Sequence, residues 1–343
     1  MTLPPRWFRR LVIDPLLVAG LVLAFLALPI WVIGGLVAAA LVPGNFRILR
    51  ISWFLFLYLA VEVVALVSLF GLWVASGFGW KLRSDGFRRA HYRLLGLLLL
   101  VVVGSAKRAF NLTVELQDPP EQTVGRPDRR PALMLSRHAG PGDSMLLLHY
   151  LVNGYRREPR IVLKEFLQWD PMVDVILNRL PVAFVPSGRK GGDRLLAAIG
   201  ELAGSMGQDG AFVIFPEGAN FSRGRQIRAI RKLHEIGRPD LAERAEALRH
   251  TLPPRTTGVQ AVLAAAPKNA DVFFIGHAGL EAFESGGDIW RGMPMDTIVA
   301  ARTWVVEAED IPPAPEQEPW LYETWAEIDA WIVATLAETA EPE

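Results

Sequence analysis

Two long apolar runs at the start of the chain constrain its fold more than any other feature. No charged residue occurs between Asp14 and Arg47, and Glu62 is the only one in residues 51–80. Each run exceeds the roughly 20 residues that a helix needs to cross a bilayer. A cleaved signal peptide is the weaker interpretation, because the first run is too long and a second one follows. The pattern predicts a transmembrane helical hairpin over residues 1–83.

Basic residues around the two runs predict how the hairpin is oriented. The connecting loop carries only Arg47 and Arg50, whereas the outer ends carry more. Those at the outer ends are Arg6, Arg9, Arg10, Lys81, Arg83, Arg88 and Arg89. Positive residues favour the cytoplasmic side, so both ends and the domain that follows are expected there, in a multi-pass protein of a bacterial inner membrane. Pro29 is expected to kink the first helix, and Glu62 to face the hairpin partner or the hydrated interface.

A third apolar run, Leu94 to Ala106, is too short to cross a bilayer upright and has basic residues at both ends. This composition predicts a helix near residues 93–107 that lies in the membrane interface. A helix buried in the protein core is the competing interpretation.

Short apolar strands then alternate with helical patterns over residues 84–310. The expected strands are 132–135, 161–164, 182–185, 211–215, 272–276 and 298–306, and the expected helices are 145–152, 171–178, 195–206, 226–249 and 258–266. This alternation predicts an α/β domain with a largely parallel sheet flanked by helices. Residues 311–343 predict an acidic amphipathic helix and tail, whose apolar stripe docks onto the domain because anionic lipid repels acidic residues.

Composition excludes several classes of function. The chain has 36 basic and 36 acidic residues, so its formal net charge is zero and no basic excess indicates nucleic acid. It has no cysteine, which excludes disulfides, a cysteine nucleophile and Cys/His structural zinc. No metal site is expected.

His138 and Asp143 are the first candidate catalytic pair. Five positions separate them, a spacing that places side chains on different faces of a helix or strand. The intervening Gly140, Pro141 and Gly142 favour a turn that brings the carboxylate back to the imidazole. A carboxylate on Nδ1 would leave Nε2 free to accept a proton from a hydroxyl group. The alternative is a loop histidine whose hydrogen bonds are made with the backbone.

A second motif, Phe215-Pro216-Glu217-Gly218, ends the strand that begins near Gly210. Pro and Gly stop the strand, so Glu217 is presented at its carboxyl end, where open α/β sheets bind ligands. The alternative is an edge turn with a solvated glutamate.

Together the two motifs make the chain resemble the glycerolipid acyltransferases, which include 1-acylglycerol-3-phosphate and lysophospholipid acyltransferases. His138 and Asp143 match the family's His-x4-Asp motif, and residues 215–218 match its Phe-Pro-Glu-Gly motif. The resemblance extends over roughly Arg93 to Ala337. The Pro-Arg-Thr-Thr-Gly segment at 254–258 is similar to the lysocardiolipin-acyltransferase-like branch.

The chain departs from the family pattern at two places. Arg137 stands where Asn usually precedes the histidine, and Ala219-Asn220 stand where Thr-Arg usually follows Glu-Gly. The usual phosphate-contacting arginine is thus missing from its place. Arg189 corresponds best to the arginine of the family's second motif, and Arg223 is a candidate replacement. Competing candidates are Arg225, Lys190 and Arg194, and for each of these arginines a solvated surface position is the alternative.

The resemblance implies a membrane-bound acyltransferase with no cofactor beyond its co-substrate, acyl-CoA or acyl-carrier protein. His138 would act as the general base and Asp143 would orient it, while Phe215, Pro216, Glu217 and Gly218 would shape the acceptor site. The expected partners are the lipid bilayer and a lysophospholipid acceptor. The most favoured acceptor is 1-acyl-sn-glycerol-3-phosphate, and the alternatives are lysocardiolipin, lysophosphatidylglycerol or an inositol lipid.

Functions outside this family have less support. A Ser-His-Asp lipid hydrolase lacks a Gly-x-Ser-x-Gly elbow, and Ser136 and Ser144 are too close in sequence to His138. A non-catalytic membrane scaffold gives no reason for the turn between His138 and Asp143. A nucleotide-binding role is weaker still, because the glycine-rich segment 188–193 fits neither the spacing of the P-loop nor that of the dinucleotide-binding motif.

Overall fold

The computed structural model describes residues 3–41, 46–117, 129–140, 142–185, 192–281 and 286–340. The chain divides into two compact units. The first consists of Met1–Leu112, Met145–Gly192 and Gly292–Asp296, and the second of Thr113–Ser144, Asp193–Arg291 and Thr297–Glu343. The boundaries expected near residues 83 and 310 remain a prediction.

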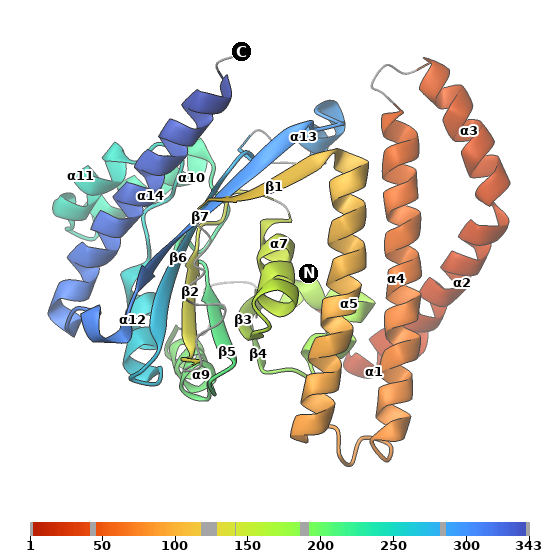
Figure 1. Ribbon diagram of the computed structural model, residues 1–343, viewed down its shortest axis with the longest axis horizontal. Coiled ribbons are helices and arrows are strands. Elements are labelled where there is room, and N and C mark those ends of the chain that lie inside the picture. The colour runs from red at the N-terminus through yellow and green to blue at the C-terminus, as the bar shows by residue number, and fades with distance from the viewer. Residues whose placement is uncertain are drawn as a thin grey trace. The chain divides into compact units, whose positions relative to one another are not determined.

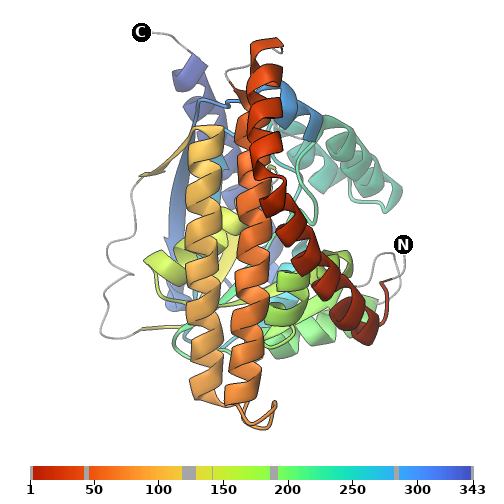
Figure 2. The same ribbon diagram turned by 90° about the vertical axis from the view of Figure 1, so that its right-hand side faces the viewer.

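The first unit begins with a series of helices (Figures 1 and 2). These are α1 (Arg6–Phe8), η1 (Arg9–Ile13), α2 (Asp14–Leu26), α3 (Leu28–Leu41), α4 (Arg47–Ala75) and α5 (Asp85–Phe110). The segments α1–α2 and α3 meet at an angle of 64°. Pro29 explains this bend, because its ring lacks an N–H donor and collides with the preceding turn.

Of the described helices, α4 alone is long and apolar enough to cross a membrane without a break. The bent segments α1–α2 and α3 would count as a second crossing only if together they form one broken span. Helices α4 and α5 pack side by side (Figure 2). The predicted hairpin is therefore supported by one apolar helix, while a second crossing and its direction remain a prediction.

The run at residues 94–106 is the second half of the 26-residue helix α5. One face of this half is buried against α4 and carries Leu95, Leu98 and Val102, whereas Leu97 and Leu100 are exposed. The buried face agrees with the core-helix alternative, and a place in the membrane interface remains a prediction.

Two charged residues of the amino-terminal segments make contacts that the sequence did not predict. Glu62 does not face a hairpin partner, because its Oε2 accepts the Met172 N–H at 2.9 Å, at the start of α8 (Pro171–Leu177). Arg9 is buried rather than a solvated flanking charge, and its Nη2 lies 2.6 Å from Asp174 Oδ1. Both residues hold α8 to the helices of the first unit.

The first unit also contains two parallel strands, β3 (Glu158–Lys164) and β4 (Val182–Val185). The π-helix η2 (Tyr150–Gly154) precedes β3, and the 3-10 helix η3 (Glu165–Trp169) follows it. Apolar side chains of α4, α5 and α8 form the core of this unit.

The second unit contains five strands in the order β1-β7-β6-β2-β5. Their bounds are β1 (Leu112–Gln117), β2 (Ala132–Ser136), β5 (Gly210–Ile214), β6 (Asp271–Ala278) and β7 (Thr297–Val306). Strand β2 pairs in parallel with β5 and β6, and β7 runs antiparallel to β6. Every residue of β2 is buried, as expected for a central strand covered on both faces.

Helices flank this sheet (Figure 1). They are α9 (Gly192–Gly204), α10 (Arg223–Glu235), α11 (Pro239–Ala247), α12 (Thr256–Ala265), α13 (Gly286–Arg291) and α14 (Gln317–Ala340), with short 3-10 turns η4 (Ala308–Asp310) and η5 (Ala314–Glu316). Helix α7 (Asp143–His149) begins in the second unit and continues into the first. Helix α14 packs against β6, and its Trp325, Ile328 and Ile332 are fully buried. The apolar stripe of the carboxyl-terminal segment therefore faces protein.

The predicted α/β class is confirmed, with seven described strands in mixed pairing and flanking helices. The polar helical stretch expected around residues 226–249 consists of two helices. It is split into α10 and α11 at Gly237, which has φ +74°, followed by Pro239 at the first turn of α11.

Candidate active site

The register of three parallel strands sets the position of the candidate site. Leu135 of β2 pairs with Ile214 of β5, and Ser136 pairs with Ile275 of β6. Continued past the strand ends, the same offsets place His138 opposite Glu217 and opposite His277. Three ionisable side chains thus meet at the carboxyl edge of the sheet, where ligands of α/β proteins bind.

His138 and Asp143 form a hydrogen-bonded pair. The distance from His138 Nδ1 to Asp143 Oδ2 is 2.8 Å. The His138 side chain is 23% exposed, whereas that of Asp143 is 4% exposed. Gly142 has φ +95°, a conformation that a glycine adopts without strain, while Pro141 lies outside the described residues. The turn therefore brings a buried carboxylate to an imidazole that solvent reaches.

Backbone and hydroxyl donors surround the Asp143 carboxylate. Its Oδ2 accepts the N–H groups of Ala139 at 2.9 Å and Gly140 at 3.3 Å, and its Oδ1 accepts the Ser144 N–H at 2.5 Å and hydroxyl at 3.1 Å. Burial acts to raise the pKa of Asp143, but the hydrogen bond with His138 and the other donors outweigh it, so this pKa is lowered. Asp143 is ionised at neutral pH.

Glu217 is not a solvated turn residue, because it is only 2% exposed. Its Oε1 accepts the His138 N–H at 3.2 Å, and its Oε2 accepts the Leu252 N–H at 3.0 Å. Burial raises the pKa of Glu217 to about 8, although Arg137 and these two N–H donors act in the opposite direction. The carboxyl group therefore joins the histidine loop to the segment around Leu252.

The other residues of the Phe-Pro-Glu-Gly motif contact either His138 or Arg255. The ring of Phe215 packs on the His138 ring, with centroids 4.6 Å apart and planes inclined by 34°. The carbonyl of Pro216 accepts the Arg255 N–H at 2.9 Å. Gly218 has φ +69°, and a Cβ there would lie 2.7 Å from Cζ of Arg255. A larger residue at 218 would displace the guanidinium.

Arg137, at the position where the acyltransferases that the chain resembles usually have Asn, is fully buried. Its Nη1 donates to the His277 carbonyl and to Glu281 Oε1, the latter at 2.5 Å, and its Nη2 donates to the His250 carbonyl at 2.7 Å. Burial acts to raise the pKa of Glu281, but the guanidinium of Arg137 outweighs it and the pKa is lowered. This ion pair, with its guanidinium buried and its carboxylate half-buried, ties the residue after β2 to the segment after β6.

His277 is the ionisable neighbour that sequence reasoning missed. Its Nε2 lies 3.7 Å from Asp143 Oδ2, beyond hydrogen-bond distance, and both its ring nitrogens lack a hydrogen-bond partner in the described structure. Burial, reinforced by Arg137, lowers the pKa of His277 to about 4. The imidazole is neutral at pH 7 and leaves His138 as the hydrogen-bonded partner of Asp143.

The two predicted phosphate-contacting arginines have different outcomes. Arg223 is exposed at the start of α10, where its Nη1 donates to Gln226 Oε1 at 2.5 Å. Arg189 and the competing Lys190 lie outside the described residues, and the side chain of Arg194 does too. The structure therefore brings together His138, Asp143 and residues 215–218, and places Arg255 against Gly218. The roles predicted for Arg189 and Arg223 remain predictions.

Two signals in the sequence could have identified the missed residues. The strand expected at 272–276 ends directly before His277, and the strand expected at 132–135 ends three residues before His138. Arg255 lies in the Pro-Arg-Thr-Thr-Gly segment at 254–258, whose resemblance to the lysocardiolipin-acyltransferase-like branch marks it as distinctive. Within the described part of the chain, no group of three His, Asp or Glu side chains could hold a metal ion.

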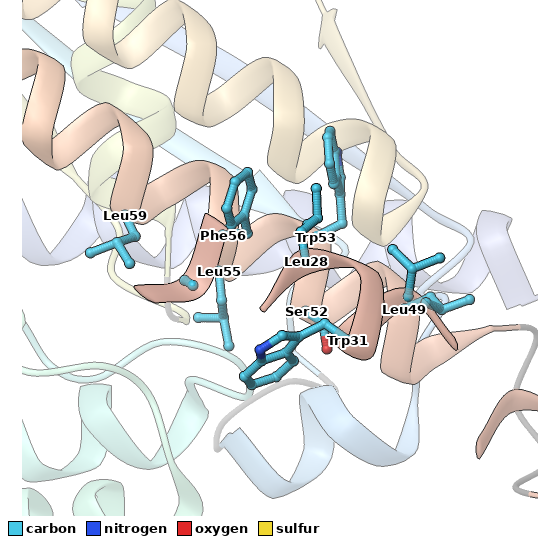
Figure 3. A pocket seen from close by; sticks show the side chains of 10 residues that line it. Leu28, Trp31, Leu49, Ser52, Trp53, Leu55, Phe56 and Leu59 are labelled. Atoms are coloured by element: carbon cyan, nitrogen blue, oxygen red, sulfur yellow. The ribbon is translucent and has the colours of Figure 1, made fainter. Parts of the chain in front are cut away.

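An apolar cavity of about 270 Å³ lies in the first unit (Figure 3). Side chains of α2, α3 and α4 line it, namely Ala24, Leu28, Trp31, Val32, Leu49, Ser52, Trp53, Leu55, Phe56 and Leu59. None of these residues belongs to the candidate active site.

Comparison with known families agrees with this geometry. Residues 115–268 match the family model described as Acyltransferase. The matched segment contains His138, Asp143 and the whole of 215–218. A search of the curated proteins finds no match. The chain thus carries an acyltransferase domain, which supports a general acyltransferase function.

Proposed function

We propose that the protein is a membrane-bound O-acyltransferase that moves a fatty acyl chain from acyl-CoA or acyl-carrier protein to the free hydroxyl of a lysophospholipid. The favoured acceptor is 1-acyl-sn-glycerol-3-phosphate, and the product is then phosphatidic acid. The observation that carries the proposal is the 2.8 Å contact between His138 Nδ1 and Asp143 Oδ2, beside the buried Glu217.

The proposed reaction follows from which atoms of His138 and Asp143 accept protons. Asp143 accepts the Nδ1 proton, so Nε2 of His138 is the free base that takes the proton of the substrate hydroxyl. The hydroxyl oxygen forms a bond to the thioester carbonyl carbon, and the carbon–sulfur bond breaks. The imidazolium returns its proton to the departing thiolate. No acyl-enzyme is needed.

The backbone around the pair restricts where the oxyanion of the tetrahedral intermediate is stabilised. The N–H groups of His138, Ala139 and Gly140 each donate to a carboxylate oxygen. These three donors hold Glu217 and Asp143 in place and are not available to the substrate. The oxyanion donor therefore belongs to another part of the site.

The apolar surface of the first unit supports binding to a membrane. Ile30, Trp31 and Leu41 on α3, and Phe70 on α4, are more than half exposed. Exposed apolar patches of this kind are typical of membrane or partner contacts. The proposed enzyme takes its lipid acceptor from the bilayer in which these helices are embedded.

The test is acyl transfer by the full chain in proteoliposomes, measured with labelled acyl-CoA and 1-acylglycerol-3-phosphate. His138→Ala should lower the rate by about 10²–10⁴-fold, because general base catalysis is lost. The exposed His234→Ala is the matched control and should keep full activity. Equal rates for His138→Ala and the unmodified chain would refute the assignment of the base.

A second acceptor class has one observation in its favour, the Pro-Arg-Thr-Thr-Gly segment at 254–258. It would make the protein a remodelling enzyme for lysocardiolipin, lysophosphatidylglycerol or an inositol lipid. Competition among these acceptors in one assay separates the two proposals. Release of free fatty acid without an acceptor would instead indicate a hydrolase.

A further inference from the structure

The guanidinium of Arg255 is held directly over the loop that follows Glu217. The Arg255 N–H donates to the Pro216 carbonyl at 2.9 Å, which fixes its backbone. Cζ, Nε and Nη1 of its side chain lie 2.7, 2.8 and 2.9 Å from the position that a Cβ of Gly218 would occupy. The absence of a side chain at Gly218 is therefore what allows the guanidinium to lie flat on this loop.

This guanidinium is charged, exposed and without an acidic partner. Among the residues that the structure describes, no carboxylate forms an ion pair with Arg255 and no group hydrogen-bonds its side chain. Two other arginines of the second unit do have acidic partners, since Arg137 pairs with Glu281 and Arg238 with Glu318. A planar guanidinium that is positioned by the backbone but has free N–H groups suits a phosphate, which it can bind through two parallel bonds.

We propose that Arg255 binds the phosphate of the lysophospholipid acceptor. This inference rests on the proposed function and adds the residue that selects a phosphorylated acceptor. Ala219 and Asn220, which follow Gly218, supply no cation, and Arg223 donates to Gln226. Arg255 provides from a distant part of the sequence the positive charge that the loop itself lacks.

Two arguments favour the acceptor's phosphate over those of coenzyme A. Glu217 bonds the backbone of both His138 and Leu252, so the segment that carries Arg255 is fixed to the loop of the general base. In 1-acylglycerol-3-phosphate the reacting hydroxyl and the phosphate are on adjacent carbons. In acyl-CoA the long pantetheine arm separates the thioester from every phosphate. A cation fixed next to the base loop therefore matches the acceptor.

The test is equilibrium binding of two lipids to the full chain in detergent micelles. The lipids are 1-acylglycerol-3-phosphate and the neutral 1-acylglycerol with the same acyl chain, and binding is measured by quenching of tryptophan fluorescence. The unmodified chain should prefer the phosphorylated lipid. Arg255→Gln should weaken this preference by about ten- to hundredfold, the usual effect of losing a charge-assisted hydrogen bond. Arg231→Gln, which removes another exposed arginine of the second unit, should leave the preference unchanged.

Gly218→Ala provides an independent check, because its Cβ would push the guanidinium away. Alone it should weaken binding of the phosphorylated lipid in the same direction as Arg255→Gln. In the Arg255→Gln background it should add little, because the group it displaces is already gone. Additive effects of the two substitutions would contradict the proposed use of this contact.

The outcomes separate this inference from the proposed function. An unmodified chain without preference for the phosphorylated lipid, or an Arg255→Gln chain that retains it, overturns the role of Arg255. A weaker affinity for acyl-CoA with unchanged affinity for the acceptor overturns it as well. A chain that loses the preference with Arg255→Gln but transfers no acyl group supports Arg255 and contradicts the proposed acyltransferase activity.

Discussion

The Glu217 carboxylate accepts the backbone N–H of His138 at 3.2 Å, while its other oxygen accepts the Leu252 N–H at 3.0 Å. The glutamate of the Phe-Pro-Glu-Gly motif thus positions the main chain of the His-x4-Asp motif. Its role is to hold the histidine loop and the Arg255 segment together. The buried carboxyl group also makes stability depend on pH, because burial raises its pKa to about 8.

Glu217→Gln should change how the stability of the protein depends on pH. The pKa of Glu217 is about 8 in the folded protein against 4.5 ordinarily, so between these values the folded chain binds a proton that the unfolded chain has released. The contribution of Glu217 to the free energy of unfolding is therefore largest at acidic pH and falls as the pH rises to about 8. Chemical denaturation of both chains in detergent at pH 5.5, 7 and 8.5 measures this difference.

The stability of the unmodified chain relative to Glu217→Gln should decrease across that series. The lowered pKa of His277 acts with the opposite sign but is present in both chains, so it cancels in the difference. The exposed Glu243→Gln is the control and should give a difference that does not change with pH. If the difference in free energy of unfolding between the unmodified chain and Glu217→Gln also stays constant with pH, the Glu217 carboxyl group has the same pKa in the folded and the unfolded chain.

Asp143→Asn should lower the rate of transfer by about 10²–10⁴-fold while the protein remains folded. The amide removes the negative charge that stabilises the imidazolium and favours the wrong tautomer of His138. Initial rates over a range of acceptor concentrations should show the loss in kcat with little change in KM.

Asp310→Asn, at an exposed position, is the matched control for loss of a carboxylate and should keep the unmodified kcat. Full kcat in the Asp143→Asn chain would mean that the 2.8 Å contact with His138 has no part in the reaction.

Both motifs and the strands before them could be recognised in the sequence, because each depends on residues that are close together in the chain. The register between β2 and its neighbours is a non-local property, and it is what places His138 opposite Glu217 and His277. A histidine without a nearby acid in sequence gave no reason to select His277. The same limit applies to Arg255, whose contact with Gly218 joins residues far apart in the chain.

Buried polar contacts were the other feature that periodicity did not reveal. Asp329 belongs to the acidic helix α14, but it is buried and accepts the N–H groups of Arg249 and His250, both at 2.8 Å. Composition assigns an acid to the surface, whereas its actual place depends on which unpaired backbone donors the fold brings to it. Arg137 is buried for the corresponding reason, since three acceptors surround it.

Arg137→Asn, which restores the residue usual in the resembling family, should destabilise this protein by about 3–5 kcal/mol. Removing the guanidinium leaves the half-buried Glu281 carboxylate without its partner, and the smaller amide cannot reach both carbonyl groups. Chemical denaturation of the full chain measures the loss. The double variant Arg137→Asn with Glu281→Gln should recover part of it, because the unpaired charge is then gone. A single variant as stable as the unmodified chain would show that the ion pair adds nothing.

Single-cysteine labelling tests the proposed arrangement in the membrane, and the chain suits it because it has no native cysteine. Cysteines replacing Ile30 or Phe70 should resist a water-soluble maleimide in membrane vesicles, since these exposed apolar positions would face lipid. Glu243→Cys, in a polar exposed position of α11, should react only when the cytoplasmic side is accessible.

Phe46→Cys, just before α4, decides between crossing and one-sided insertion. If the two apolar segments form a hairpin with both ends in the cytoplasm, the residues that join them lie on the opposite side of the membrane. Phe46→Cys should then react from the outside of intact cells, where Glu243→Cys does not. Labelling of both positions from the cytoplasmic side alone would mean that α4 does not cross. Its contacts with α8 through Glu62 would then hold these helices in a single leaflet.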